Sequence, residues 1–142
     1  MERDRPAVVL DTNVFVAAGF NPGSDAARVV GAVREGRLRM AWNDATRQET
    51  RAILERIPPL SWQTVEGLFR EEGRFRERTA PDRFRQIPDP DDRKFAALAH
   101  AAGAILVSLD DDLLSDPHRI AILVLTPSEF VAEGRANARR SR

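Results

Sequence analysis

Two short apolar segments of this sequence each run directly into an aspartate. Residues 7–10 end at Asp11, and residues 104–109 end at Asp110. Continuous apolar runs of this length are typical of buried parallel strands, and such sheets bind their ligands beyond the carboxyl ends of the strands. If the two strands are neighbours, their carboxylates lie side by side at that edge. Such a pair could hold a divalent metal ion.

The number of acids after the second segment favours the same chemistry. Asp110, Asp111 and Asp112 are consecutive, whereas a turn needs only one such residue. Like charges held close together raise the free energy unless a cation neutralises them. Mg²⁺ and Mn²⁺ prefer carboxylate and water ligands, and they can orient a phosphodiester and activate a water molecule. Zinc is disfavoured, because the chain has no cysteine and His100 and His118 have no paired spacing.

Taken singly, each candidate acid also has a purely structural interpretation. An aspartate after a strand, such as Asp11 or Asp110, commonly starts a turn. Asp92 follows an expected helix cap at Asp89, and a carboxylate at that position satisfies free amides in the first turn. Glu49 fits an exposed helix position that pairs with a neighbouring arginine. Only the convergence of these acids would make a metal site.

The elements that must position these acids alternate between strands and helices. We predict strands at residues 7–10, 38–42, 104–109 and 120–125. We predict helices after caps at Ser24, at Asn43 or Asp44 and at Thr126, one or two helices over residues 61–78, and a helix over residues 91–102 that Gly103 ends. This alternation implies a parallel sheet that helices cover on both faces, and therefore an α/β fold.

Length and composition indicate one domain. The 142 residues suit a single domain, which we place at residues 1–134, followed by a basic, disordered tail at 135–142. No apolar run is long enough to span a membrane, and the first residues lack the apolar stretch of a signal peptide. We therefore expect a cytoplasmic protein without a membrane partner.

Charge gives little further indication of a partner. Acidic and basic residues number 22 each, so the net charge does not indicate nucleic-acid binding. All the cationic side chains are arginines except Lys94. The arginines gather in residues 69–85 and in the tail, where they are candidates for phosphate contacts, although a solvated helix face explains the first group equally well.

Five segments, in order along the chain, resemble the motifs of PIN-domain nucleases. They are residues 9–16 (VLDTNVFV), 48–54 (QETRAIL), 89–95 (DPDDRKF), 106–114 (LVSLDDDLL) and 125–130 (LTPSEF). The resemblance extends over residues 7–131. It is strongest to the short bacterial and archaeal PIN proteins described as toxin components of toxin–antitoxin pairs, the VapC-like group.

This resemblance implies a fold, a reaction and a set of site residues. The fold is a three-layer α/β/α sandwich with a central parallel sheet of four or five strands. The reaction is hydrolysis of phosphodiester bonds in single-stranded RNA by an endoribonuclease that depends on Mg²⁺ or Mn²⁺ and uses no protein nucleophile. The implied partners are the RNA substrate, a cognate antitoxin and a second copy in a homodimer. The implied catalytic and metal-binding acids are Asp11, Glu49, Asp92 and Asp110, with Asp112 as a further metal-site acid and Asn13 and Ser108 in support.

The sequence departs from the family pattern at two places. Leu109 stands where the fourth motif usually has glycine, which we expect to constrain the backbone that enters Asp110. Asn43 and Asp44 replace the usual serine and proline before the glutamate-bearing helix, and both are good helix caps.

Two alternative functions stay open at this point. One is a binding or interaction module that keeps the fold without catalysis. The other is a magnesium-dependent phosphatase or receiver-type protein. A phosphatase of that type would need an acid at Asn13, and a receiver would need a lysine after a late strand, whereas Lys94 lies within a predicted helix. The sequence contains no P-loop motif.

Overall fold

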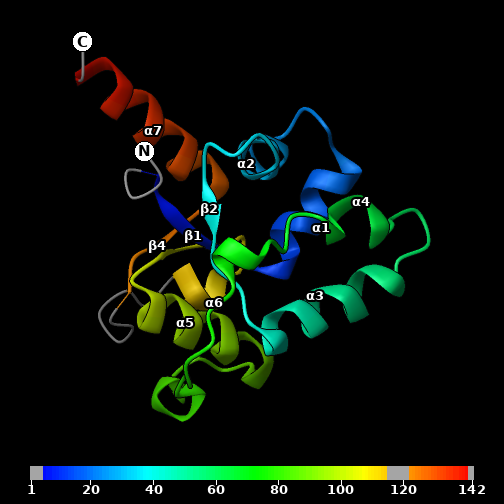
Figure 1. The fold of residues 1–142 in the computed structure, drawn as a ribbon, viewed down its shortest axis with the longest axis vertical. Coiled ribbons are helices and arrows are strands. Elements are labelled where there is room, and N and C mark those ends of the chain that lie inside the picture. The colour runs from blue at the N-terminus through cyan, green and yellow to red at the C-terminus, as the bar shows by residue number, and fades with distance from the viewer. Residues whose placement is uncertain (1–4, 115–121, 141–142) are drawn as a thin grey trace.

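Four parallel strands form one sheet in the computed structural model, which describes residues 5–114 and 122–140. The strands are β1 (Ala7–Leu10), β2 (Arg39–Met40), β3 (Ile105–Val107) and β4 (Val124–Leu125), in the order β2-β1-β3-β4. The predicted strand at 120–125 is described only from residue 122 onward. The two strands that lead into Asp11 and Asp110 are neighbours, with Leu10 paired to Val107. Helices flank the sheet (Figure 1), so the predicted α/β sandwich with a four-stranded parallel sheet is confirmed.

Helices connect the strands and extend beyond the last one. They are α1 (Thr12–Phe20), α2 (Asp25–Arg34), α3 (Asp44–Glu55), α4 (Gln63–Glu66), α5 (Pro90–Ala102), α6 (Asp111–Leu114) and α7 (Pro127–Arg140), with 3-10 turns η2 (Glu71–Gly73) and η3 (Pro81–Phe84). The helices predicted over residues 61–78 are wrong in extent, because only α4 and η2 form there. Within the described residues, no helix is both long and apolar enough to cross a membrane.

The predicted helix ends are confirmed by side-chain caps. Ser24 accepts a hydrogen bond from the Ala27 amide, and Asn43 accepts one from the Thr46 amide. Gly103 ends α5 with a φ of 65°, in the left-handed region that glycine adopts without strain. The last helix continues to Arg140, beyond residue 134, where the sequence places the start of a tail.

Alternate side chains of β1 supply the two sides of the core. Val8 and Leu10 belong to a buried cluster that includes side chains of α1 and α2, against which Phe130 of α7 also packs. Val9 belongs to a second buried cluster on the other face, built mainly on α5. Because successive strand residues point to opposite faces, a four-residue strand is enough to join both layers. The end of β1 is therefore held on both sides.

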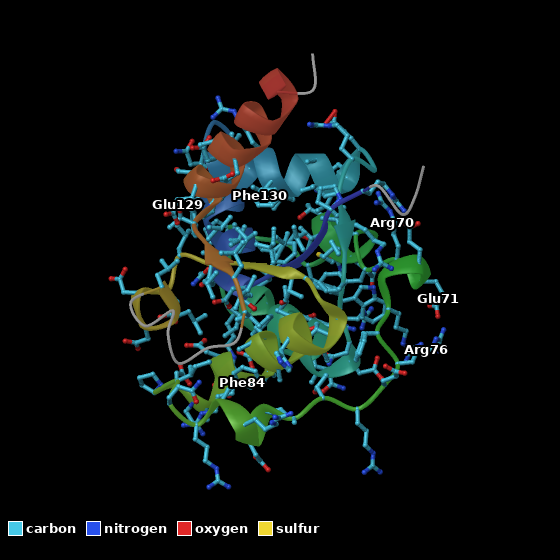
Figure 2. The ribbon with its side chains drawn as sticks, turned by 90° about the vertical axis from the view of Figure 1, so that its left-hand side faces the viewer. Arg70, Glu71, Arg76, Phe84, Glu129 and Phe130 are labelled. Carbon is cyan, nitrogen blue, oxygen red and sulfur yellow. The ribbon has the colours of Figure 1, made fainter. Side chains whose placement is uncertain are left out.

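Residues 70–76, which we call the edge strap, cover the outer edge of β2. The Trp42 amide donates to the Gly73 carbonyl at 3.0 Å, and the Phe75 amide donates to the Trp42 carbonyl at 2.7 Å. Figure 2 shows Arg70, Glu71 and Arg76 along this segment. An edge strand with unpaired backbone groups invites pairing with other chains, and the strap occupies those groups at Trp42.

Arginines of the edge strap already have partners within the chain. Arg70 donates to the carbonyls of Val33 and Arg34 at 2.7 and 2.8 Å. Arg74 pairs with Asp44 and lies over the Trp42 ring, and Arg76 pairs with Glu71. These contacts show that the arginines attach the strap to the rest of the chain. They are therefore weaker candidates for phosphate contacts.

Candidate metal centre

Three acids from distant parts of the sequence converge at the carboxyl end of the sheet. Asp11 follows β1, Asp110 follows β3, and Asp92 lies in the first turn of α5. One carboxylate oxygen of each lies within 4.8 Å of the other two. We call these residues the aspartate cluster. The sequence predicts that Asp11 and Asp110 meet if their strands are neighbours, and the pairing of β1 with β3 confirms that condition.

Asp11 is the most buried member of the cluster, with 4% of its surface exposed. Its Oδ1 accepts the Thr12 amide at 2.7 Å, so Asp11 also caps α1. Its Oδ2 accepts the Ser108 hydroxyl at 2.8 Å. Burial is the main cause that raises the pKa of Asp11 to about 6. The two hydrogen bonds lower this pKa, and the negative charges of Asp110 and Glu49 raise it by a smaller amount. The two hydrogen bonds therefore orient the Asp11 carboxylate, but they do not fully offset the cost of burying its negative charge.

Asp92 carries the clearest sign that a cation belongs in the cluster. Its Oδ2 is buried, and no donor among the described residues reaches it. The pKa of Asp92 is raised to about 8, first by burial, then by a hydrogen bond with Asp110 that only the protonated acid can donate, and then by neighbouring negative charge. A buried carboxylate oxygen without a donor is costly. A divalent cation would supply the missing partner, so the donor set fits Mg²⁺ or Mn²⁺.

Two polar side chains join the ends of β1 and β3. The Ser108 hydroxyl donates to Asp11 and accepts the Asp110 amide at 2.9 Å. The Asn13 side-chain oxygen accepts the Leu109 amide at 3.2 Å, while its amide group lies 3.5 Å from Asp11 Oδ2. These are the positions that the resemblance gave as supporting residues, and their contacts fit that role.

Leu109 does not disturb the entry to Asp110. No non-glycine residue in the described ranges has a positive φ, so the backbone at this position does not require glycine. The Leu109 side chain is 44% exposed and meets solvent instead of the cluster. The expected constraint at Leu109 is therefore absent from the backbone conformation.

Glu49 lies on the wall of the same site but outside the aspartate cluster. A pocket of about 300 Å³ is lined by Asp11, Glu49 and Asp92 among others. The next residue, Thr50, shares a hydrogen bond of 2.9 Å with the Thr12 hydroxyl, which ties α3 to the start of α1. Glu49 Oε1 lies 3.0 Å from the ammonium nitrogen of Lys94.

Asp112 and Lys94 differ most from the sequence-based interpretation. Asp112 is exposed, and its backbone amide, not its carboxylate, contacts the site by donating to Asp110 Oδ1 at 2.8 Å. Lys94, which pairs with Glu49, is not among the site residues that the family resemblance implies. The sequence does carry one signal for Lys94, because it is the only lysine and lies two residues after Asp92.

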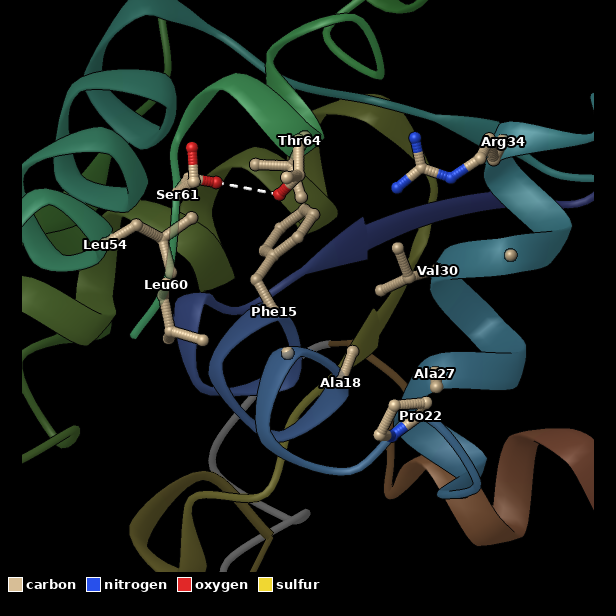
Figure 3. Close-up of a pocket in the computed structure, with 13 residues that line it drawn as sticks. Phe15, Ala18, Pro22, Ala27, Val30, Arg34, Leu54, Leu60, Ser61 and Thr64 are labelled. Carbon is tan, nitrogen blue, oxygen red and sulfur yellow. Dashed lines mark hydrogen bonds between the residues drawn. The ribbon is translucent and has the colours of Figure 1, made fainter. Parts of the chain in front are cut away.

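A second pocket, of about 220 Å³, lies among α1, α2, α3 and α4. Phe15, Val30 and Leu54 line it from three helices, and Arg34 stands at its margin (Figure 3). No carboxylate is among its described lining residues. Its chemistry therefore differs from that of the acidic pocket, and it does not offer a metal site.

Comparisons with known proteins agree with this geometry. A family model described as PIN domain matches residues 7–112. A crystal structure of FitAcB from Neisseria gonorrhoeae superposes with a TM-score of 0.57 at 16% identity, covering 85% of this chain and 98% of that one. A structure of FitAB bound to an IR36 DNA fragment gives a TM-score of 0.57 at 15% identity, covering 84% and 94%. No curated protein matches the sequence. At these identities the structural likeness shows the shared fold.

Proposed function

The chain belongs to the PIN domain family, and from this premise we propose that it is a metal-dependent endoribonuclease that cleaves single-stranded RNA. The observation that carries the proposal is the aspartate cluster, with its three oxygens within 4.8 Å and one buried oxygen that lacks a donor. Such a cluster is costly in a metal-free protein. A function that needs a bound cation explains why the fold assembles it.

In this proposal Asp11, Asp92 and Asp110 hold Mg²⁺ or Mn²⁺. When bound, the ion would stabilise the charge of the scissile phosphate and lower the pKa of an attacking water. Ser108 and the Thr12 amide fix the orientation of Asp11. The Asp112 backbone amide, at the start of α6, donates to the Asp110 carboxylate, and the Ser108 hydroxyl accepts the Asp110 backbone amide.

We further propose that the chain is the toxin of a toxin–antitoxin pair. This rests on the resemblance to the VapC-like group and on the fold that it shares with FitAcB and FitAB. Expression of the chain alone in a bacterial host should arrest growth, and Asp11→Asn should relieve the arrest. Growth unaffected by the wild-type chain at full expression would contradict the toxin role.

A homodimer is the remaining proposal taken from the family resemblance. It predicts that the purified chain has twice the mass of 15.9 kDa in solution. Light scattering after size-exclusion chromatography measures that mass directly. A monomeric mass at micromolar concentration would contradict the proposal.

The nuclease proposal is tested by cleavage of labelled single-stranded RNA with Mn²⁺ or Mg²⁺, with and without EDTA. Cleavage should require the metal and fall by at least about a hundredfold in Asp11→Asn and Asp92→Asn. Asp111→Asn is the matched control, because Asp111 is an exposed acid beside Asp110 and outside the cluster.

Two results would contradict the nuclease proposal. Equal rates of cleavage by Asp11→Asn and the wild-type chain would show that cleavage does not depend on the aspartate cluster. Lack of cleavage of any of several RNAs, in a folded protein that binds the metal, would favour a non-catalytic binding module.

A further inference from the structure

The single lysine of the chain pairs with Glu49, a half-buried acid that lines the pocket outside the aspartate cluster. Lys94 on α5 reaches Glu49 on α3, with Nζ 3.0 Å from Oε1 and the two side chains 24% and 21% exposed. Asp91, the other acid near the ammonium group, is 4.0 Å away and 69% exposed. The Lys94 charge is therefore directed mainly at Glu49.

The choice of lysine at this position has a physical reason. Every other cationic side chain in the sequence is an arginine. An ammonium group is a compact point charge, whereas a guanidinium group is a broad, planar fork. A compact cation can therefore sit directly beside the Glu49 carboxylate, as a metal ion would, with Nζ 3.0 Å from Oε1.

The acids around the site divide into two sets. The aspartate cluster presents three carboxylates to one point within 4.8 Å, which suits a single divalent ion. Three acids outside the cluster, Glu49, Asp89 and Asp91, also line the pocket, but both aspartates are exposed. Glu49 is the half-buried one that a second ion would use, since two-metal sites place their ions about 4 Å apart between shared carboxylates. Its charge is already balanced by Lys94.

We propose that the Lys94 ammonium group takes the place of a second metal ion beside Glu49, so that the site binds one divalent ion, on Asp11, Asp92 and Asp110. This inference rests on the proposed function and specifies its metal stoichiometry. Lys94 is then a positioning residue, which acts on the site through Glu49. Glu49 stays at the pocket wall and is not a metal ligand.

The test is a titration of the metal-free protein with Mn²⁺, read by calorimetry and by the electron paramagnetic resonance signal of free Mn²⁺. The wild-type chain should bind one ion. Glu49→Gln should also bind one, with a dissociation constant within about threefold of the wild type, because it loses only a charge that is already paired. Lys94→Met should bind two ions, since the unpaired Glu49 carboxylate becomes available. Lys94→Arg, which keeps the positive charge, should bind one.

Three results would overturn the inference. They are two ions on the wild-type chain, a loss of binding in Glu49→Gln as large as in Asp92→Asn, or a single ion on a folded Lys94→Met protein. If Lys94→Met fails to fold, the wild-type and Glu49→Gln titrations still decide the question. Failure of the proposed function is distinguishable, because it would appear as a wild-type chain with neither Mn²⁺ binding nor metal-dependent cleavage.

Discussion

The Ser108 hydroxyl donates a hydrogen bond of 2.8 Å to Asp11 Oδ2, between residues 97 positions apart in the sequence. Ser108 is fully buried, and the same hydroxyl accepts the Asp110 amide. One side chain therefore sets the relative position of two members of the aspartate cluster. It also lowers the pKa of Asp11, which burial raises.

Ser108→Ala should weaken both the fold and the metal site. We expect a loss of about 1–3 kcal/mol in the free energy of unfolding, because buried polar partners are left without a hydroxyl. The Mn²⁺ dissociation constant should rise by about tenfold or more, as is usual when the residue that orients a ligand is removed. Urea denaturation and Mn²⁺ titration measure the two effects.

Ser128→Ala provides the matched control for that substitution. The Ser128 hydroxyl also donates to an aspartate oxygen, Asp25 Oδ2, at 2.8 Å, but on the exposed surface. Its loss should change stability by less than about 0.5 kcal/mol and leave Mn²⁺ binding unaltered. Equal effects of the two substitutions would show that Ser108 has no special role in the site.

Gly73→Ala should destabilise the chain strongly through the edge strap. A Cβ atom at this position would lie 1.9 Å from the Met40 carbonyl oxygen, so either the strap or β2 would have to move. We expect a loss of about 3 kcal/mol or more in the free energy of unfolding, because the two nearest atoms belong to the Met40 backbone. Urea denaturation of Gly73→Ala and of Gly67→Ala, where a Cβ meets nothing within 4 Å, makes the comparison. A Gly73→Ala protein as stable as Gly67→Ala would contradict the close packing of the strap.

The parts of the fold that could be predicted from sequence are those with local signals. The strands leading into Asp11 and Asp110 are continuous apolar runs, and Ser24 and Asn43 carry the side chains that cap helices. The first helix, Thr12–Phe20, was missed. Its residues are apolar almost all round, so they lack the polar face whose period identifies a helix.

The site was predictable as far as strand order determines it. Asp11 and Asp110 meet because β1 and β3 pair. Whether Glu49 and Asp112 join them depends on how α3 and α6 pack, which no local pattern specifies. The edge strap is not predictable for a similar reason, because its conformation depends on contacts with Trp42, two residues beyond β2, and not on a local pattern in the strap itself.

The metal-free protein should become less stable as pH rises from about 4 to 8. The folded-state pKa values of Asp11 and Asp92 are raised to about 6 and about 8, above unfolded values of about 4. The native state therefore binds more protons than the unfolded chain in this window, and stability is lost as pH rises through each folded pKa. Urea denaturation in EDTA, followed across this range, measures the effect.

Asp92→Asn should remove much of that pH dependence. At pH 8 the variant should be more stable than the wild-type chain by on the order of 2 kcal/mol, after allowance for the solvent that screens a half-buried carboxyl group. At pH 4 the two proteins should be nearly equal. Asp111→Asn should keep the wild-type dependence. A difference between Asp92→Asn and wild type that does not change with pH would contradict a raised pKa at Asp92.

Mn²⁺ should raise the melting temperature, since an ion that binds only the native state stabilises it by mass action. At an ion concentration of a hundred times the dissociation constant, this stabilisation amounts to about 2.7 kcal/mol, or roughly 5–10 °C in melting temperature for a domain of this size.

The melting temperature of Asp92→Asn should shift little with Mn²⁺, because the variant loses a member of the cluster. Asp112→Asn should shift like the wild type, because the Asp112 carboxylate lies outside the cluster. Thermal melts with EDTA, Mn²⁺ and Mg²⁺ measure all three proteins. A wild-type melting temperature indifferent to millimolar Mn²⁺ would show that the aspartate cluster is not a preformed metal site.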